Sequence, residues 1–376
     1  MKRALRLLVP ALMTCMVILL VAPGVATALS GDQVFEFNGE LGATQGYELN
    51  DDLADTSWEF SFVQLTDLHI GEGPDDYGTP GYDDKPPAGD VGEPAVELRD
   101  AVNWINANKA TYMIKFVIIT GDLTQSAERS EFLKGKEILD SLDIPYIPVI
   151  GNHDIWPYTQ TEESPSPVGD QYFREVFADQ FETLRNLMPG WDDGTRNTLI
   201  VNGEEGCNSY FQNFAFDYAG YHFICADFNT RSHAISGKGA NPWANLFDSE
   251  ACRGTWYWYK NHFNSYPYKA ANNVLTFTHQ PLYNNSVFTF SEGEYNTITD
   301  FFYNNNYKDN VGLWMGGHFH EAVPPWSPPF EYEIKTSTGH FICPGVHSKA
   351  SKDGYSRLVK TWGKTSTPNP SGVILY

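Results

Sequence analysis

Short hydrophobic runs alternate with amphipathic stretches through most of the chain. Runs rich in β-branched and aromatic residues predict strands, and apolar residues spaced three or four positions apart predict helices. The expected strands 116–120 and 146–150 are separated by one expected helix, 129–142. This order favours a right-handed crossover between parallel strands. The other expected strands are 60–65, 273–281, 311–320, 334–342 and 355–361, and the other expected helices are 94–108, 170–187, 254–263 and 294–305.

The segment 209–228 has a different pattern. Two aromatic, roughly alternating runs flank the residues Tyr218-Ala219-Gly220-Tyr221, which predicts an antiparallel hairpin. The sequence shows no internal repeat and no clean linker. We therefore expect one α/β domain over residues 56–363 whose sheets include antiparallel strands, with a lead-in at 29–55 and a C-terminal tail at 364–376.

Several of the strand-like runs end on residues that commonly bind metals. The run "FVQLTDLHI" ends on Asp67 and His69, and "VIITGDLTQ" breaks at Gly121 and continues with Asp122. In open α/β sheets the carboxyl ends of the strands meet at one crevice, so we expect these side chains to lie together. Further candidates at strand ends are Asn152, His153 and Asp154 after "YIPVIG", His279 after "VLTFT", and His318 and His320 in "LWMGGHFH".

The charges of these side chains point to metal ions. Burying Asp67 and Asp122 side by side without cations would cost several kcal/mol or force one of them to bind a proton. Carboxylate, imidazole and amide ligands suit Zn²⁺, Fe or Mn²⁺. The expected ligands are too many for one ion and suit two ions, which one carboxylate can bridge. These ligands are Asp67, His69, Asp122, Asn152, His279, His318 and His320.

The first 28 residues have the character of a secretory signal peptide. Lys2, Arg3 and Arg6 precede an apolar stretch, and Ala26-Thr27-Ala28 has the small residues of a cleavage site. We expect cleavage after Ala28 and secretion; the alternative is an uncleaved membrane anchor, because the stretch is almost long enough to span a bilayer. Losing the three basic residues would change the net charge from −22 to −25.

Such an acidic chain is a poor partner for nucleic acid or an anionic membrane, since both require basic patches. A small anionic substrate is compatible with it if metal ions supply local positive charge. Two divalent ions, two carboxylates and one bridging hydroxide sum to about +1. The sequence does not indicate the oligomeric state.

Four cysteines follow the signal segment, and no Cys-x-x-Cys spacing is present, which argues against a thiolate zinc site. Cys225 and Cys343 lie in strand-like runs, where a free thiol is often a small buried apolar group. Cys207 and Cys252 lie in polar, Gly-rich surroundings, so a bridge between these two is the pairing that we favour among the three possible.

The motifs "TDLH", "TGDLT", "IGNHD", "THQP" and "GGHFH", in this order, resemble those of the calcineurin-like metallophosphoesterases. This family includes purple acid phosphatases, cyclic nucleotide phosphodiesterases and sphingomyelinase-type enzymes. The resemblance covers about residues 58–323. It implies a four-layer αββα sandwich with mixed sheets, a two-metal centre of Fe, Mn or Zn, and a small-molecule phosphoester substrate.

The resemblance also implies a role for each ligand. Asp122 would bridge the two metals, and a hydroxide between the metals would attack phosphorus. His153 would act as the general acid that protonates the leaving oxygen, with Asp154 orienting it. Asp67, His69 and His320 would bind one metal, and Asn152, His279 and His318 would bind the other.

Two departures from the family's patterns argue against the iron–tyrosinate site of the purple acid phosphatases and against the protein Ser/Thr phosphatase branch. The purple acid phosphatases have an iron-binding tyrosine three residues after the bridging aspartate, and this chain has Gln125 there. The protein Ser/Thr phosphatases continue with an arginine that binds phosphate, whereas this chain reads "GDLTQSA". The leading hypothesis is a secreted phosphomonoesterase; the alternatives are a phosphodiesterase and a non-catalytic binding protein of the family.

Other polar residues have simpler interpretations. His222, His262 and His340 lie in aromatic or apolar runs, which is typical of core or surface histidines. Arg231, just after the "CADF" strand, is a candidate phosphate contact, with a solvated loop arginine as the alternative.

Overall fold

The structure of the protein is a computed structural model. It describes residues 60–72, 86–157, 169–196, 199–202, 207–231, 244–246, 255–266, 274–282, 289–305, 307, 311–318, 355–363 and 370–375. None of the helices in these ranges has the length and apolar character needed to cross a bilayer.

A five-stranded mixed sheet carries the first half of the fold. Its strands are ordered β11-β10-β1-β2-β3, and the neighbours β1, β2 and β3 run parallel, whereas β10 is antiparallel to both β1 and β11. All seven residues of β1 are buried, because side chains pack against both faces of the sheet. The strands are β1 (Phe60–Thr66), β2 (Ile114–Thr120), β3 (Tyr146–Val149), β10 (Tyr355–Gly363) and β11 (Pro370–Leu375).

A second, four-stranded sheet has the order β6-β7-β8-β9. Strands β7, β8 and β9 are parallel, and β6 forms an antiparallel hairpin with β7. A separate antiparallel pair is formed by β4 and β5. The strands are β4 (Leu199–Asn202), β5 (Cys207–Tyr210), β6 (Phe214–Tyr218), β7 (Tyr221–Cys225), β8 (Val274–Phe277) and β9 (Val311–Met315).

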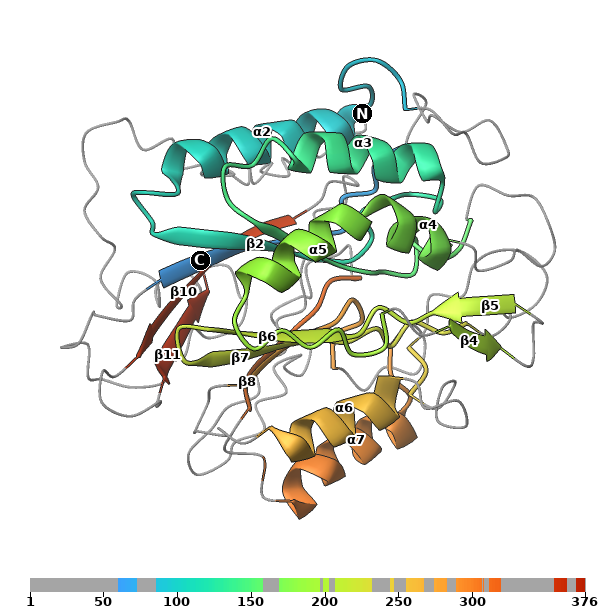
Figure 1. Ribbon diagram of the computed structural model, residues 1–376, viewed down its shortest axis with the longest axis vertical. Helices are drawn as coiled ribbons and strands as arrows, with labels where there is room; N and C mark the ends of the chain where they lie inside the picture. Colours follow the sequence, from blue (N-terminus) through green and yellow to red (C-terminus); the bar gives the residue numbers. More distant parts are fainter. Residues whose placement is uncertain are drawn as a thin grey trace, which may run out of the picture.

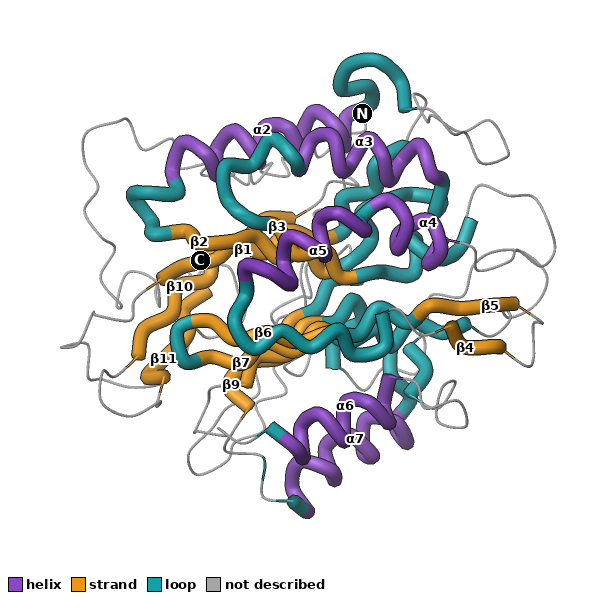
Figure 2. The backbone as a smooth tube through the Cα atoms, viewed as in Figure 1, coloured by secondary structure: helices purple, strands orange, loops and turns teal. Residues whose placement is uncertain are grey.

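Helices cover the outer sides of the two sheets, which gives the four layers of an αββα sandwich (Figure 1). Helices α2 and α3 lie above the five-stranded sheet with α4 and α5 beside them, and α6 and α7 lie below the four-stranded sheet (Figure 2). The helices are α2 (Glu93–Asn108), α3 (Arg129–Leu139), α4 (Gly169–Val176), α5 (Ala178–Leu187), α6 (Thr255–Ser265) and α7 (Glu292–Asn304).

Aromatic side chains fill the space between the two sheets. The ring of Phe62 on β1 lies 5.8 Å from those of Phe223 on β7 and Phe277 on β8, and the ring of Phe116 on β2 lies 5.4 Å from that of Phe223. All four side chains are fully buried. Burying each contributes roughly 1.5–3 kcal/mol to stability. This packing fixes the sheets against each other and so holds their strand ends in one place.

The sequence predicted the α/β class and most of the elements. The strands that became β1, β2, β3, β8, β9 and β10, the β6–β7 hairpin and the helices α2, α3, α6 and α7 are confirmed within a few residues. The expected strand at 334–342 lies outside the described residues, as do the signal segment and the cysteines Cys252 and Cys343. Cys225 is buried and free, in agreement with its interpretation as a small apolar group.

The single helix predicted at 170–187 is wrong. The chain forms α4 and α5, and between them Phe177 has φ −95° and ψ 13°, away from the usual helical values. The Phe177 ring lies 5.0 Å from that of Phe173 and 6.4 Å from that of Phe132 on α3. Packing of this buried ring accompanies the bend.

Residues 370–375, which we placed in the tail, form strand β11 beside β10. The segment "PSGVIL" begins with proline and contains a glycine, so its sequence gives only a weak strand signal.

Candidate metal centre

The candidate site lies where the carboxyl ends of both sheets meet. Asp67 and His69 follow β1, Asp122 follows β2, Asn152, His153 and Asp154 follow β3, His279 follows β8, and His318 follows β9. The structure therefore brings together residues from five strands, as the sequence predicted. His320, the remaining expected ligand, lies outside the described residues.

The backbone at this site is unusual. Asp67, His69, Asp122 and His318 have φ of 52°, 47°, 51° and 76°, in the left-handed region that residues other than glycine rarely adopt. Each such residue costs roughly 1–3 kcal/mol, and such residues are concentrated at functional sites. The chain thus accepts strain at four of the candidate ligand positions that follow strands.

One group of potential ligands surrounds His279. Its Nε2 lies 3.0 Å from Oδ2 of Asp122, 2.9 Å from Oδ1 of Asn152 and 3.1 Å from Nδ1 of His318. Its Nδ1 lies 2.9 Å from the carbonyl oxygen of Thr120, which can only accept, so Nδ1 carries the hydrogen. The Nε2 lone pair of His279 is therefore directed at the same point as two oxygens and a second imidazole.

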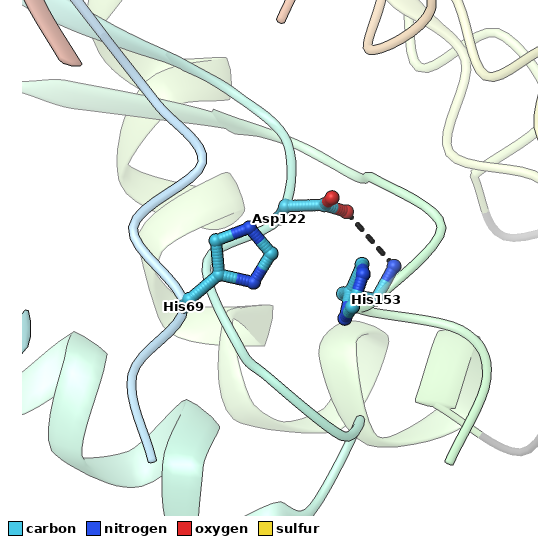
Figure 3. Close-up of side chains that lie close together, drawn as sticks. All are labelled: His69, Asp122 and His153. Atoms are coloured by element: carbon cyan, nitrogen blue, oxygen red, sulfur yellow. Dashed lines mark hydrogen bonds between the residues drawn. The ribbon is translucent and has the colours of Figure 1, made fainter. Parts of the chain in front are cut away.

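A second group contains Asp122 together with His69 and His153 (Figure 3). One potential ligand atom from each of the three lies within 4.8 Å of the others, and the same holds for Asp122, His279 and His318. Oδ1 of Asp122 accepts a hydrogen bond of 2.8 Å from the backbone N–H of His153. Asp122 is thus the member that the two groups share.

The buried carboxylate of Asp122 fits a cation. Its Oδ2 accepts no hydrogen bond, although it is fully buried and faces the imidazole of His279. Burial would raise the pKa of Asp122, but the positive charge that His279, His153 and His69 can carry lowers it well below its usual value. Burial likewise would lower the pKa of His279, but Asp122 and Asp67 raise it to about 9. The ionised carboxylate therefore requires positive charge, which a metal bound at Nε2 can supply in place of a proton.

Asp67 is held in place beside β9. Its Oδ2 accepts a hydrogen bond of 2.7 Å from the hydroxyl of Thr66, and its Oδ1 accepts one of 2.9 Å from the backbone N–H of His318. A side chain at Gly317 would collide with this carboxylate and with Thr66, so the close approach of the two strand ends requires glycine there. Asp67 belongs to neither of the two groups of potential ligands found among the described residues.

Gln125 supports both His69 and His153. Its side-chain Oε1 lies 2.8 Å from Nδ1 of His69, and its backbone carbonyl oxygen lies 2.7 Å from Nδ1 of His153. Both oxygens accept, so each ring carries its hydrogen on Nδ1 and leaves Nε2 available. Contacts of this kind fix the orientation of metal-binding histidines. The sequence showed only that Gln125 occupies the position of a missing tyrosine, and this role was not predicted.

We expect the substitution Gln125→Leu to weaken metal binding on the His69 side. The leucine removes the acceptor for His69 but keeps the backbone carbonyl that holds His153. Loss of such a contact typically lowers metal affinity about 10–100-fold. Competition with a chelator would measure this, and Gln125→Glu, which keeps an acceptor oxygen, is the matched control. Equal affinity in the leucine variant and the wild type would remove Gln125 from the site.

Asp154 connects the chain after β3 to the chain after β2. Its Oδ1 accepts from the backbone N–H and the hydroxyl of Thr124 at 2.8 and 3.0 Å, and its Oδ2 accepts from the N–H of Gly151 at 2.8 Å. Burial, and next the nearby charge of Asp122, raise the pKa of Asp154 to about 7. Asp154 therefore stabilises the loop that carries His153. The Nδ1 of His153 itself faces the carbonyl oxygen of Gln125.

Arg231 differs from both of its sequence interpretations. It is fully buried, its Nη2 lies 2.7 Å from Oδ2 of Asp227, and its Nε lies 3.2 Å from Oδ2 of Asp170. Its guanidinium also lies 4.5 Å from the ring centre of Phe211. Arg231 is therefore neither a solvated loop arginine nor directed at a phosphate, but the centre of a buried ion-pair network.

Comparison with known proteins finds one family that the chain matches over most of its length. The sequence profile of the calcineurin-like phosphoesterase family matches residues 60–322, more than half of the chain. No curated protein matches the chain significantly.

Solved structures that match the chain include a purple acid phosphatase from yellow lupin (Lupinus luteus) seeds, with 13% identity and a TM-score of 0.41 over 84% of this chain and 53% of that one. A dimetal phosphatase from Danio rerio has 12% identity and a TM-score of 0.42 over 85% of this chain and 99% of that one. A calcineurin-like phosphoesterase from Bacillus subtilis has 13% identity and a TM-score of 0.40 over 85% and 90%. The chain spans about half of the lupin protein. The family assignment rests on the profile match.

Proposed function

Because the chain belongs to the calcineurin-like phosphoesterase family, we propose that it hydrolyses a phosphomonoester at a centre of two metal ions. The observation that carries the proposal is the position of Asp122, which is shared by two groups of potential ligands. A carboxylate has two oxygens, and here Oδ1 and Oδ2 face different groups. Asp122 can therefore hold a cation on either side.

We assign the remaining ligands by their place around Asp122. Asn152, His279 and His318 converge on one side, and His69 lies on the other. Asp67 and His320 complete the second set, as the family's motifs imply. Bound ions of Zn, Fe or Mn would supply a nucleophile at neutral pH and offset the charge of the phosphate.

His153 is the general acid in this proposal. Its ring is partly exposed, so a substrate can reach it, whereas Asp122 and His279 are fully buried. Its Nδ1 is held by the carbonyl of Gln125, and its Nε2 is the atom that can give a proton to the leaving oxygen. Its ring centre is 4.6 Å from that of His69, which keeps the acid next to the metal ligands.

The N-terminal segment supports a further part of the proposal, that the protein is exported. The basic start, the apolar stretch and the small residues up to Ala28 support cleavage there and secretion. The substrate is then a small phosphoester outside the cell, and the positive charge of the metal centre would offset the repulsion of this anion by the acidic surface.

Metal removal tests the proposal. We expect the purified protein to release p-nitrophenol from p-nitrophenyl phosphate, to lose this activity in a chelator, and to regain it with Zn²⁺, Mn²⁺ or Fe. Metal analysis of the active protein is expected to give two ions at the centre. The same assay with bis(p-nitrophenyl) phosphate measures the preference for diesters.

Each other outcome has a definite meaning. Faster turnover of the diester would overturn the monoester assignment and make the protein a phosphodiesterase. Two bound ions without turnover of either ester would indicate a binding protein of the family. Full activity after complete metal removal would contradict the metal-dependent mechanism.

A further inference from the structure

Two histidines that the sequence assigned to the core or surface form a cluster far from the metal centre. His222 is the second residue of β7 and pairs with Val274, the first residue of β8, whereas His279 follows the other end of β8. His262 lies on α6 and reaches the same place. The cluster is therefore at the amino-terminal edge of the four-stranded sheet, and the candidate metal centre is at the carboxyl-terminal edge.

Four titratable groups form a continuous chain in this cluster. Nδ1 of His222 lies 2.7 Å from Oδ1 of Asp217 on β6, and Nδ1 of His262 lies 2.7 Å from Oδ2 of Asp192. Nε2 of His222 lies 2.8 Å from Nε2 of His262. The order is thus Asp217, His222, His262, Asp192, with the two imidazoles facing each other in the middle.

Two neutral imidazoles carry too few hydrogens to form all three contacts of this chain as hydrogen bonds. Three contacts of hydrogen-bond length each require one hydrogen, but ionised carboxylates supply none and each neutral imidazole supplies one. Because both Nδ1 atoms face carboxylates, both hydrogens are used there. Two Nε2 lone pairs then face each other, which requires one additional positive charge between them, either a proton or a metal ion.

The surroundings resemble the support of a metal site. A carboxylate on Nδ1 of each ring fixes the orientation of metal-binding histidines. The ring of His222 also stacks on Tyr266 with centres 3.7 Å apart, and that of His262 stacks on Trp258 at 5.1 Å. The separation of the two Nε2 atoms is close to the 3.1 Å between the facing nitrogens of His279 and His318 in the candidate metal centre.

We propose that His222 and His262 bind one transition-metal ion, such as Zn²⁺ or Cu²⁺, through their Nε2 atoms, with water completing the coordination. Imidazole is a preferred ligand of both ions. Two zinc-bound nitrogens stand about 3.3 Å apart in tetrahedral geometry, so the rings must separate by a few tenths of an ångström. His262 is partly exposed, which allows this movement and gives water access. The ion would join β6, β7, α6 and the segment of Asp192, and this site is independent of the proposed phosphoesterase activity.

Metal content distinguishes a metal ion between the two Nε2 atoms from a proton. After equilibration with Zn²⁺ and removal of the excess, we expect the wild-type protein to hold one ion more per chain than His262→Gln. Both proteins are expected to hydrolyse p-nitrophenyl phosphate equally, because His262 is remote from the metal centre. Zinc is expected to raise the melting temperature of the wild type by about 2–4 °C more than that of the variant.

Two further variants keep the test decisive if His262→Gln is unstable. Asp192→Asn keeps both imidazoles, changes a partly exposed carboxylate, and is expected to lower zinc affinity about 10-fold or more. Asn261→Gln, at an exposed neighbouring position of α6, is the matched control and is expected to behave as the wild type. The proposal is overturned if the wild type and His262→Gln hold equal numbers of ions and gain equally from zinc, because the pair then holds a proton only.

Discussion

Replacing Asp122 by asparagine is expected to remove nearly all activity and to lower the metal content. Only a carboxylate carries charge on both oxygens, and in this structure one oxygen faces His279 while the other accepts from the N–H of His153. Asparagine has the same shape and one neutral oxygen, so it can keep the second contact but bridges two cations poorly. Removing even a supporting contact of a metal ligand costs up to about 100-fold, and we expect a larger loss here. Turnover and ions per chain measure the two effects separately.

A matched substitution tests whether the effect of Asp122→Asn depends on losing the carboxylate at the site or on losing any carboxylate of the chain. Asp300→Asn makes the same chemical change at an exposed position of α7 and is expected to leave turnover and metal content as in the wild type. The melting temperature of Asp122→Asn in a chelator tests folding, since an asparagine oxygen can also accept the hydrogen bond that the backbone N–H of His153 donates to Oδ1 of Asp122. Two tightly bound ions and near-normal turnover in Asp122→Asn would disprove the bridging role.

The position of Asp122 could be predicted because local and global signals agree. A buried β-branched run gives a strand, and parallel strands place their carboxyl ends at one edge, so the residue after the strand belongs to that edge. The same reasoning located His69, Asn152 and His279. The left-handed backbone conformation of Asp122 was not predictable, since it depends on how the neighbouring strand ends pack in the folded chain.

The contacts that the sequence missed join residues far apart in the chain. Gln125 is 56 positions from His69, and His222 is 40 positions from His262. Each of these side chains has an ordinary local sequence, and only the packing of different elements gives it a partner. For the same reason Arg231 could not be assigned from its loop, because its partners Asp170 and Asp227 lie on different segments that meet only in the folded chain.

Replacing His153 by alanine is expected to slow the hydrolysis of esters with poor leaving groups while both metal ions stay bound. The backbone N–H of residue 153 still donates to Asp122 in this variant, so the loop remains in place. General acid catalysis typically contributes about 10²–10⁴-fold, and we expect a loss of this size with an alkyl phosphate. An activated p-nitrophenyl leaving group requires less protonation, so its loss is expected to be much smaller. Single-turnover rates on the two esters, compared with the wild type, measure the difference.

The controls for this variant distinguish an acid from a metal ligand. His153 lies within the same group of potential ligands as His69 and Asp122, so metal content must be measured in the variant. A fall in metal occupancy with equal losses on both esters would make His153 a ligand. Equal losses with both ions retained would also exclude the acid role, because a residue that protonates the leaving oxygen must matter most where that oxygen is most basic. A large loss confined to the alkyl ester, with unchanged metal content, is the result that the position of His153 beside the carbonyl of Gln125 predicts.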